Sequence, residues 1–391
     1  MDRRTDILTP DTAFLADPSA QRVCAMLEDA GHQVYFVGGC VRNAVIGAPI
    51  SDIDVATDAH PEVVIDLAGA AGIKAVPTGI DHGTVTLVID STPFEVTTFR
   101  RDVDTDGRRA VVKFSDDMAE DARRRDFTMN ALYADARGVI HDPVQGLEDA
   151  RMGRVRFIDD ASQRIAEDYL RILRFFRFSA WYGDPALGWA PDALAAIAAG
   201  LDGLAGLSAE RVGAEMLKLL AAHDPAPALS VMARVGVLSA LLAGADPRFL
   251  GPLIHLEAQN EIAPHAYTRL AALGGDDVAE RLRLSRKGQK QLEAIQTMAA
   301  STRGPRALGH LVGVDVGQGA MLLRAAMTSG DLPDGWVDAL LEGSKTTFPV
   351  RATDLPDLRG EALGRRLKAL KQHWLDSDLT LSCDALLALP S

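Results

Sequence analysis

Two acidic side chains near the N-terminus have the types and spacing of a metal site. Asp52 and Asp54 are two positions apart in the segment Ser51–Val55, so on a β-strand both carboxylates would leave the same face. Adjacent carboxylates repel each other unless a cation neutralises them. Hard oxygen ligands at this spacing suit Mg²⁺, which also binds substrate phosphates. The pair predicts a magnesium site, and a solvated strand end is the alternative for this motif taken alone.

A glycine turn lies just upstream of the acidic pair. Gly38 and Gly39 have no side chain that would keep a triphosphate away from the backbone. They open a predicted short helix whose N-terminus favours an anion, and Arg42 lies one turn into this helix, where it can pair with a phosphate. Such a turn is also common without any ligand. Together with the acidic pair, it predicts a site for a metal-bound nucleoside triphosphate.

The pattern of apolar and turn-forming residues predicts the elements that carry this site. We expect helices over residues 14–30, 39–46 and 60–70 and strands over 34–37, 51–55, 74–76, 83–89 and 94–99, with a hairpin turn at 90–93. The acidic pair is expected at the end of its strand. Glu95 lies on a strand that can pair beside it, so Glu95 is either a third catalytic carboxylate or a solvated strand residue. Residues 100–109 are polar and are expected to form a loop, of the kind that often closes over substrates.

A second dense motif occupies residues 121–132. It contains three consecutive arginines, which can neutralise phosphate, and we expect Arg125 to contact the ligand. Asp126 can accept a hydrogen bond from a ribose hydroxyl. Alternatively, Asp126 forms a salt bridge with an arginine while Asn130 caps a helix. The turn-rich residues 141–149 that follow are interpreted as a hinge between domains.

From Ile165 onward the pattern is helical to the C-terminus. Asp168 and Arg171 are three positions apart, so on a helix they lie one above the other on the same face. Arg174 and Arg177 extend this stripe. On this motif alone, an ordinary amphipathic helix with an internal Asp–Arg pair is the favoured interpretation.

Composition restricts the class of protein further. The chain has 391 residues, of which 47% are hydrophobic, and a formal net charge of −13, which argues against a protein that coats nucleic acid non-specifically. Three scattered cysteines predict a reduced compartment without a disulfide framework. We find no membrane-spanning run and no secretory signal, and we expect a cytoplasmic protein. Two basic clusters are either solvated faces or contacts for RNA phosphates: Arg281, Arg283, Arg286, Lys287 and Lys290, and Arg365, Arg366, Lys368 and Lys371.

Taken in order, these motifs resemble a class II CCA-adding tRNA nucleotidyltransferase, a family of the DNA polymerase beta superfamily. The resemblance covers Val37 to about Arg211. It rests on Gly38-Gly39-x-Val41-Arg42, Asp52-x-Asp54, Arg124-Arg125-Asp126-Phe127-Thr128-x-Asn130-Ala131, Asp142-Pro143 with Gly146, Glu167-Asp168-x-x-Arg171-x-x-Arg174 and Ser208-x-Glu210-Arg211. Asn43 stands where the family usually carries Asp, and we expect this departure to have a small effect.

The resemblance implies an α+β fold. A head at 1–150 holds a mixed sheet, and it is followed by an all-helical neck at 151–205, body at 206–270 and tail at 271–391. It implies that Asp52 and Asp54 hold two Mg²⁺ ions, and the strand-pairing argument adds Glu95 as a candidate third catalytic carboxylate. It also implies CTP, ATP and the acceptor stem and 3′ end of tRNA as partners, with no membrane and no obligate protein partner. The nucleotide-binding residues would be Gly38, Gly39, Arg42, Arg125, Asp126, Asp168, Arg171, Arg174 and Arg177.

The implied base-reading pair has a chemical rationale. An ionised Asp only accepts hydrogen bonds and an Arg only donates them. Cytosine and adenine each present an amino donor beside a ring-nitrogen acceptor, which matches Asp168 with Arg171, whereas uracil and guanine present the reverse. The main rivals are a bacterial poly(A) polymerase and an enzyme that adds only CC or only A. A non-catalytic RNA-binding protein and a nucleotide sensor without RNA are alternatives from other classes.

Overall fold

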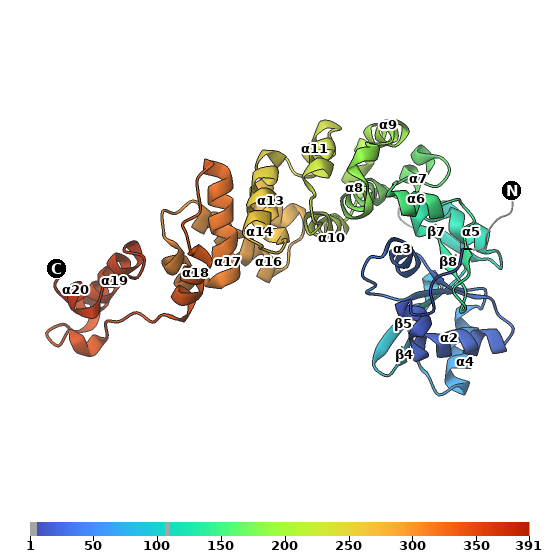
Figure 1. Cartoon of the computed structure of the whole chain (residues 1–391), viewed down its shortest axis with the longest axis horizontal. Helices are drawn as coiled ribbons and strands as arrows, with labels where there is room; N and C mark the ends of the chain where they lie inside the picture. Colours follow the sequence, from blue (N-terminus) through green and yellow to red (C-terminus); the bar gives the residue numbers. More distant parts are fainter. Residues whose placement is uncertain (1–5, 106–109, 391) are drawn as a thin grey trace. The chain divides into compact units, whose positions relative to one another are not determined.

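The computed structural model describes residues 6–105 and 110–390, which include part of the segment expected to be a loop but not Asp106 or Gly107. The chain divides into two compact units, one up to Leu207 and one from Ser208 onward (Figure 1). The four domains expected from the resemblance, with boundaries at 150, 205 and 270, stay a prediction. No helix in the described ranges is long and apolar enough to cross a membrane.

The first unit is built on a seven-stranded mixed sheet with strand order β3-β4-β5-β2-β1-β8-β9. Only β2 and β5 run parallel to each other, and the other neighbours are antiparallel. A separate two-stranded sheet pairs β6 with β7. The strands are β1 (Val34–Val37), β2 (Asp54–Thr57), β3 (Lys74–Gly79), β4 (Thr84–Ile89), β5 (Thr92–Thr98), β6 (Arg100–Thr105), β7 (Ala110–Phe114), β8 (Tyr133–Ala134) and β9 (Ile140–His141).

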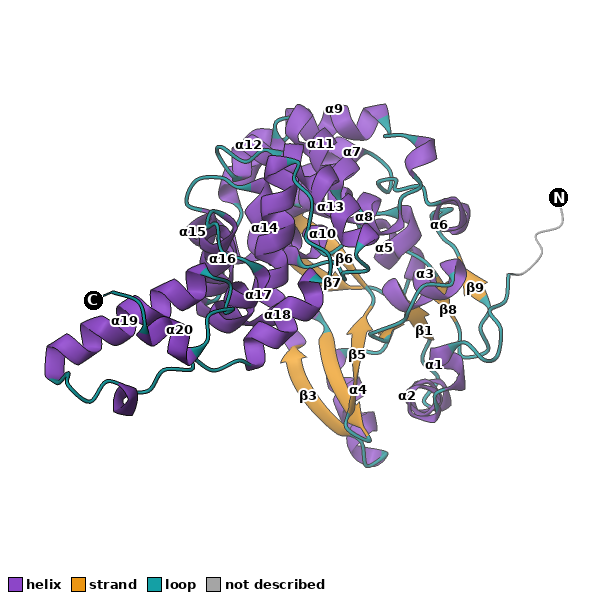
Figure 2. Cartoon of the chain, turned by 60° about the vertical axis from the view of Figure 1, so that its left-hand side comes forward, coloured by secondary structure: helices purple, strands orange, loops and turns teal. Residues whose placement is uncertain are grey.

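Helices follow and cover this sheet, and α4 packs against β3, β4 and β5 (Figure 2). The helices of the first unit are α1 (Ala13–Ala16), α2 (Pro18–Asp29), α3 (Gly39–Ile46), α4 (Pro61–Ala70), α5 (Met118–Arg123), α6 (Leu147–Met152), α7 (Ala161–Glu167), α8 (Leu170–Tyr182) and α9 (Pro191–Ala199). The α+β fold class predicted from the sequence is confirmed.

The glycine turn is formed as predicted. Gly38 has a φ of 71° at the start of α3, and Gly47 has a φ of 69° at its end, a backbone region that glycine enters without steric cost. β1 therefore leads directly into α3, and Arg42 lies in the first turns of that helix. Because β2 and β5 pair in parallel register, Asp54 stands opposite Glu95, which confirms the predicted position of Glu95 beside the acidic strand.

Three local predictions are wrong in detail. The helix expected at 14–30 is broken at Asp17, whose carboxylate accepts hydrogen bonds from the backbone of Ser19 and Ala20 at the start of α2. The acidic pair lies at the beginning of β2 rather than at its end, and Asp52 precedes the strand. The segment expected to be a loop forms strand β6 before it leaves the described residues, because pairing with β7 depends on a partner strand that its polar composition does not reveal.

The turn-rich segment 141–149 lies within the first unit. Asp142 accepts hydrogen bonds from the backbone N–H groups of Gly146 (2.7 Å) and Leu147 (3.0 Å) and so caps the start of α6. The expected hinge at this segment stays a prediction, and the division of the chain falls about sixty residues later.

The second unit is helical in every described element longer than a turn. Its α-helices are α10 (Ala209–Leu220), α11 (Ala226–Arg234), α12 (Val237–Leu241), α13 (Leu250–Gln259), α14 (Ala266–Leu273), α15 (Val278–Arg281), α16 (Arg286–Ala299), α17 (Pro305–Thr328), α18 (Trp336–Lys345), α19 (Gly360–Asp376) and α20 (Cys383–Leu387). On α19, Leu370 and Trp374 are buried in the core with Leu367 beside them, as the sequence pattern predicted.

A buried ion pair joins three helices of the second unit. Arg269 is 1% exposed and contacts Glu257, which is 3% exposed, at 2.7 Å. The same guanidinium donates to the carbonyls of Leu220 (2.8 Å), Ala222 and His223 (3.0 Å) at the end of α10. Arg269 therefore satisfies carbonyl groups that the end of a helix leaves without partners.

Removing Arg269 alone should strand a buried charge. We expect Arg269→Leu to lower the free energy of unfolding by about 3–5 kcal/mol, because Glu257 would stay buried without its partner. The double variant Arg269→Leu/Glu257→Leu should lose less, although it also lacks the carbonyl contacts. Urea denaturation of both variants measures the difference, and a double variant less stable than the single one would contradict this account.

Candidate active site

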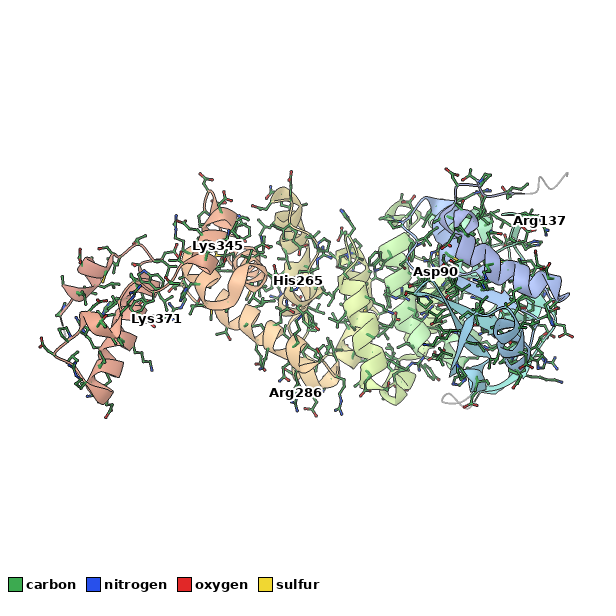
Figure 3. The ribbon with its side chains drawn as sticks, turned by 90° about the horizontal axis from the view of Figure 1, so that it is seen from below. Asp90, Arg137, His265, Arg286, Lys345 and Lys371 are labelled. Atoms are coloured by element: carbon green, nitrogen blue, oxygen red, sulfur yellow. The ribbon has the colours of Figure 1, made fainter. Side chains whose placement is uncertain are left out.

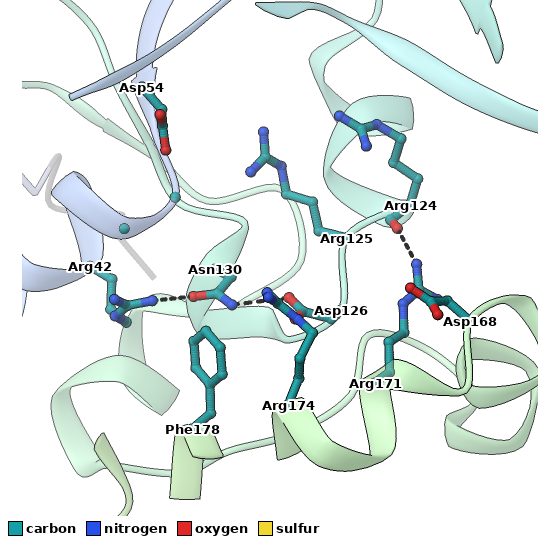
Figure 4. A pocket seen from close by; sticks show the side chains of 12 residues that line it. Arg42, Asp54, Arg124, Arg125, Asp126, Asn130, Asp168, Arg171, Arg174 and Phe178 are labelled. Atoms are coloured by element: carbon teal, nitrogen blue, oxygen red, sulfur yellow. Dashed lines mark hydrogen bonds and ion pairs between the residues drawn. The ribbon is translucent and has the colours of Figure 1, made fainter. Parts of the chain in front are cut away.

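One pocket of about 410 Å³ lies in the first unit, a volume within the range of ligand sites. Its walls come from the glycine turn, α3, β2, the segment after α5 and the start of α8. Figure 4 shows these side chains directed toward one another across the pocket. The lining residues are Gly38, Gly39, Arg42, Asp54, Arg124, Arg125, Asp126, Asn130, Asp168, Arg171, Arg174 and Phe178.

The pocket brings together all predicted site residues except Asp52, Glu95 and Arg177. Asp52 is exposed, and its carboxylate accepts a hydrogen bond from Ser51 Oγ (3.0 Å). Glu95 is also exposed, beside Asp54 on β5. The Arg177 guanidinium lies over the ring of Phe178, 4.4 Å from its centroid. The roles expected for all of these residues stay predictions.

Asp54 is a carboxylate of the pocket whose pKa is raised. Burial and the neighbouring charge of Glu95 raise its pKa to about 6, with a further contribution from Asp52, while Arg125 opposes the rise. A carboxylate whose ionised form is disfavoured in this way is relieved by a cation. Within residues 6–105 and 110–390, however, no three acidic, histidine or cysteine side chains are grouped to hold a metal ion. A divalent-cation site at Asp52 and Asp54 stays a prediction.

A buried carboxylate positions the consecutive arginines. Asp121 is 1% exposed and forms ion pairs with Arg124 (2.7 Å) and Arg125 (3.1 Å). The hydroxyl of Tyr133 also donates to Asp121 (2.7 Å). Although burial opposes ionisation, the two guanidinium groups hold the pKa of Asp121 down at about 2. Arg124 and Arg125 are thus held at the pocket by an acid that remains charged.

A second chain of hydrogen bonds crosses the floor of the pocket (Figure 4). Arg42 donates to the Asn130 side-chain oxygen, and Asn130 Nδ2 donates to Asp126 Oδ1 (3.0 Å). Arg174 in turn forms an ion pair with Asp126 (2.6 Å). Burial works against ionisation here too, but Arg174 and Asn130 keep the pKa of Asp126 below its usual value. The structure therefore favours the ion-pair interpretation of Asp126, while Asn130 bridges two charged groups rather than capping a helix.

Arg42 is held on two further sides. It is 5% exposed, and its guanidinium lies 3.9 Å from the ring centroid of Tyr182 and 5.2 Å from that of Phe178, which stabilises the cation through the faces of the rings. Asn43, at the position that departs from the family pattern, accepts from Arg42 Nε (3.1 Å) and Nη2 (2.9 Å). Asn43 also donates to the carbonyl of Pro49 (2.6 Å). It therefore ties Arg42 to the segment that leads to Asp52.

The predicted base-reading pair lies in the pocket, but its local structure differs from the prediction. Asp168 is not on a helix: it lies between α7 and α8 with an extended backbone, and it accepts a hydrogen bond from Leu170 N (3.1 Å). The Arg171 guanidinium forms an ion pair with Glu167 (2.6 Å) instead of the expected internal pair with Asp168. Arg171 also donates to the carbonyl of Arg124 (2.8 Å). Both side chains nevertheless line the same pocket as Asp54.

Several residues of the site were not predicted from the sequence to line the pocket or to position its arginines. Arg124 and Asn130 line the pocket and lie inside the second motif, so the motif itself was the signal. Phe178 follows Arg174 by one helical turn and was within reach of the same spacing argument. Asp121 and Glu167 form ion pairs with arginines three or four positions further along the chain. Helical spacing was therefore a signal for these pairs, although it did not reveal that they hold the arginines at the pocket.

Comparisons with known proteins agree with this architecture. Residues 34–156 match the Poly A polymerase head domain, and residues 190–248 match the family described as Probable RNA and SrmB- binding site of polymerase A. The mitochondrial CCA tRNA nucleotidyltransferase 1 of Danio rerio is 31% identical over 387 residues, which cover 91% of this chain and 86% of that protein. The CCA-adding enzyme of Geobacillus stearothermophilus is 41% identical over 224 residues, 57% of this chain and 54% of that protein. The crystal structure of the Bacillus stearothermophilus CCA-adding enzyme in complex with CTP gives a TM-score of 0.70 at 28% identity and covers 92% of both chains.

A head domain of this kind, with arginines and a carboxylate around one pocket, defines a nucleotidyltransferase. The chain belongs to the CCA tRNA nucleotidyltransferase family, which confirms the family and the class of enzyme predicted from the motifs. Enzymes with the nucleotidyltransferase fold generally use divalent metal ions.

The raised pKa of Asp54 predicts a pH-dependent penalty in the metal-free protein. Asp54 has a folded pKa of about 6 against its ordinary value of 3.8. The folded chain therefore binds more protons than the unfolded chain between these two values, and stability falls as the pH rises through them. With a chelator present, Asp54→Asn should therefore melt at a higher temperature than the wild type at pH 7.5. This gain should shrink as the pH approaches 4. Thermal unfolding followed by circular dichroism across this pH range tests the direction of the effect. A difference in melting temperature between variant and wild type that grows toward low pH would contradict the prediction.

Proposed function

We propose that this pocket transfers CMP and AMP from CTP and ATP to the 3′ end of tRNA, building CCA without a nucleic-acid template. One observation carries the proposal: a single pocket contains Asp54 of the acidic pair together with Asp168 and Arg171, the groups suited to reading a base. In the reaction, the 3′ hydroxyl of the tRNA forms a bond with the α-phosphorus. The bond from that phosphorus to the bridging oxygen of the pyrophosphate breaks.

We infer that the metal is Mg²⁺, held by Asp52 and Asp54, with Glu95 as a further acidic neighbour. Carboxylate oxygens are the ligands that this ion prefers, and it commonly bridges to substrate phosphates. When bound, two such ions would lower the pKa of the attacking hydroxyl and stabilise charge on the leaving oxygens. The raised pKa of Asp54 supports this assignment, because a cation relieves the repulsion between Asp54, Glu95 and Asp52.

The chain's own residues mainly position the substrates and neutralise charge. Gly38 and Gly39 leave the backbone open to the phosphates at the start of α3. Arg42, Arg125 and Arg174 supply positive charge around them, and each is held in place by a side-chain hydrogen bond or ion pair. Positive charges that are already fixed in place stabilise the negative charge of the transition state, because the site does not have to rearrange during the reaction.

Base choice is assigned to Asp168 and Arg171. The Asp168 carboxylate accepts from the amino group of cytosine or adenine, and Arg171 donates to the adjacent ring nitrogen. Uracil and guanine would place a carbonyl against the carboxylate and a ring N–H against the guanidinium. Each buried group left without a partner costs about 1–3 kcal/mol, so the pair favours CTP and ATP.

The basic clusters of the second unit are proposed to contact tRNA phosphates. The exposed residues around the start of α16 are Arg281, Arg283, Arg286, Lys287 and Lys290, and Figure 3 labels Arg286 among them. Within the cluster, Arg283 approaches Glu210 (3.3 Å) at a solvent-exposed position. No obligate protein partner is proposed, and the cytoplasmic location stays a prediction, since the Danio rerio relative is mitochondrial by name.

The assignment of Asp54 to the metal site predicts that its loss affects nucleotide addition but not tRNA binding. Asp54→Ala should abolish nucleotide addition because the acidic pair is lost, while tRNA affinity stays within about two-fold of the wild type. Incubation with tRNA that lacks its CCA end, with Mg²⁺ and labelled CTP or ATP, followed by sizing of the products, measures the addition. Full activity in the variant would refute the metal assignment.

The same assay separates the related activities. The wild type should extend the tRNA by two residues with CTP alone and by three with CTP and ATP together. Long adenylate tracts would instead identify a poly(A) polymerase. Products that stop after CC with both nucleotides present, or that appear only on tRNA already ending in CC, would identify a partial CCA-adding enzyme.

A further inference from the structure

The outer side of α8 carries an exposed aromatic residue beside the pocket. Trp181 is 47% exposed. The other tryptophans of the chain are more enclosed: Trp336 is 4% exposed, Trp374 is 1% exposed, and Trp189 is half-buried against Phe175 and Phe176. The indole ring of Trp181 lies 6.4 Å, between centroids, from the ring of Tyr182, and that ring in turn covers Arg42 at the pocket.

The helical spacing places Trp181 next to the residues of the pocket. Arg174, Phe178 and Tyr182 follow one another at four-residue intervals, and this stripe faces the pocket and Arg42. Arg174, Arg177 and Trp181 form the neighbouring stripe, with Arg174 shared between the two. A ligand that leaves the pocket along α8 would therefore meet two guanidinium groups and then the indole ring.

The charge around this stripe fits a polyanion. Arg177 lies over Phe178 and close enough to Arg42 to influence its charge. Asp184, three residues after Trp181, directs its carboxylate to the backbone N–H of Ala186 (2.8 Å) at the start of a 3₁₀ helix, and Arg174 keeps its ion pair with Asp126 (2.6 Å). Guanidinium groups that follow a backbone, combined with an aromatic ring for a base, are the usual features of a single-strand binding surface.

We propose that Trp181 is a stacking platform for an unpaired base near the 3′ end of the tRNA, with Arg177 beside the neighbouring phosphate. The inference rests on the proposed function, because the 3′ hydroxyl must reach the pocket that Asp54 lines. Every base has a flat aromatic face, so such a platform tolerates the change from C to A as the end grows. It would hold the acceptor strand without contributing to the choice of the incoming nucleotide.

Three substitutions of Trp181 distinguish base stacking from a contact that needs only a bulky apolar side chain. Trp181→Ala and Trp181→Leu should each raise the KM for tRNA lacking CCA roughly ten-fold, the size of one lost base stack. Trp181→Phe should stay within about two-fold, because it keeps an aromatic face. The KM for CTP should not change in any of them, since the pocket itself is intact. Leu187→Ala, at another exposed apolar residue of the same unit (43% exposed), is the matched control and should behave as the wild type.

Intrinsic fluorescence gives an independent readout. Binding of tRNA should quench the emission of the wild type, and Trp181→Phe should bind with similar affinity but lose most of the quenching. Melting temperatures of the variants show whether the fold is retained, and Trp181→Leu keeps an apolar side chain if the alanine variant is unstable.

Unchanged KM for tRNA in both the alanine and leucine variants, or unchanged quenching in the phenylalanine variant, would overturn the proposal. If Asp54→Ala abolishes addition while the Trp181 variants match the wild type, only the stacking role fails. If the wild type binds tRNA but adds no nucleotide, the proposed function fails, and the affinities and the quenching still decide the role of Trp181.

Discussion

Mutual repulsion between positive charges is the constraint on which the site depends. Five arginines line one pocket: Arg42, Arg124, Arg125, Arg171 and Arg174. Without fixed negative partners, guanidinium groups gathered this closely would move apart or lose their order. Three acids that are buried or mostly buried, Asp121, Asp126 and Glu167, pair with four of these arginines at 2.6–3.1 Å, and Asn130 links the fifth, Arg42, to Asp126. The buried carboxylates therefore stabilise a cationic pocket that is already formed before any ligand binds.

These ion pairs also connect parts of the chain that are distant in sequence. Arg174 on α8 meets Asp126, 48 residues earlier, and Asn130 extends this contact to Arg42 on α3. Arg171 donates to the carbonyl of Arg124, so α8 is also attached to the segment after α5. A displacement of one of these elements would shift the others with it, which keeps α3, α8 and the segment after α5 in a fixed arrangement.

Local features of the site could be predicted from the sequence, whereas the hydrogen-bond partners that are distant along the chain could not. The strand–glycine turn–helix unit and the hairpin between β4 and β5 are determined by nearby residues, and both were predicted correctly. The position of Asp168 outside a helix depends on a local hydrogen bond to Leu170 N that competes with the helical pattern. Glu167 and Asp168 lie four and three positions before Arg171, so helical spacing permits either ion pair, and the structure selects Glu167. The contact of Arg171 with the carbonyl of Arg124 joins segments 47 residues apart, so no local pattern could reveal it.

We propose that Asp168 and Arg171 read the base of a nucleotide whose phosphates lie toward Asp54. The most direct measurement is the ratio of kcat/KM for CTP to that for UTP, in the wild type and in Asp168→Asn. A side-chain amide can donate to the uracil carbonyl that the carboxylate rejects. We predict that discrimination against UTP falls ten-fold or more in the variant, whereas an unchanged ratio would contradict the account.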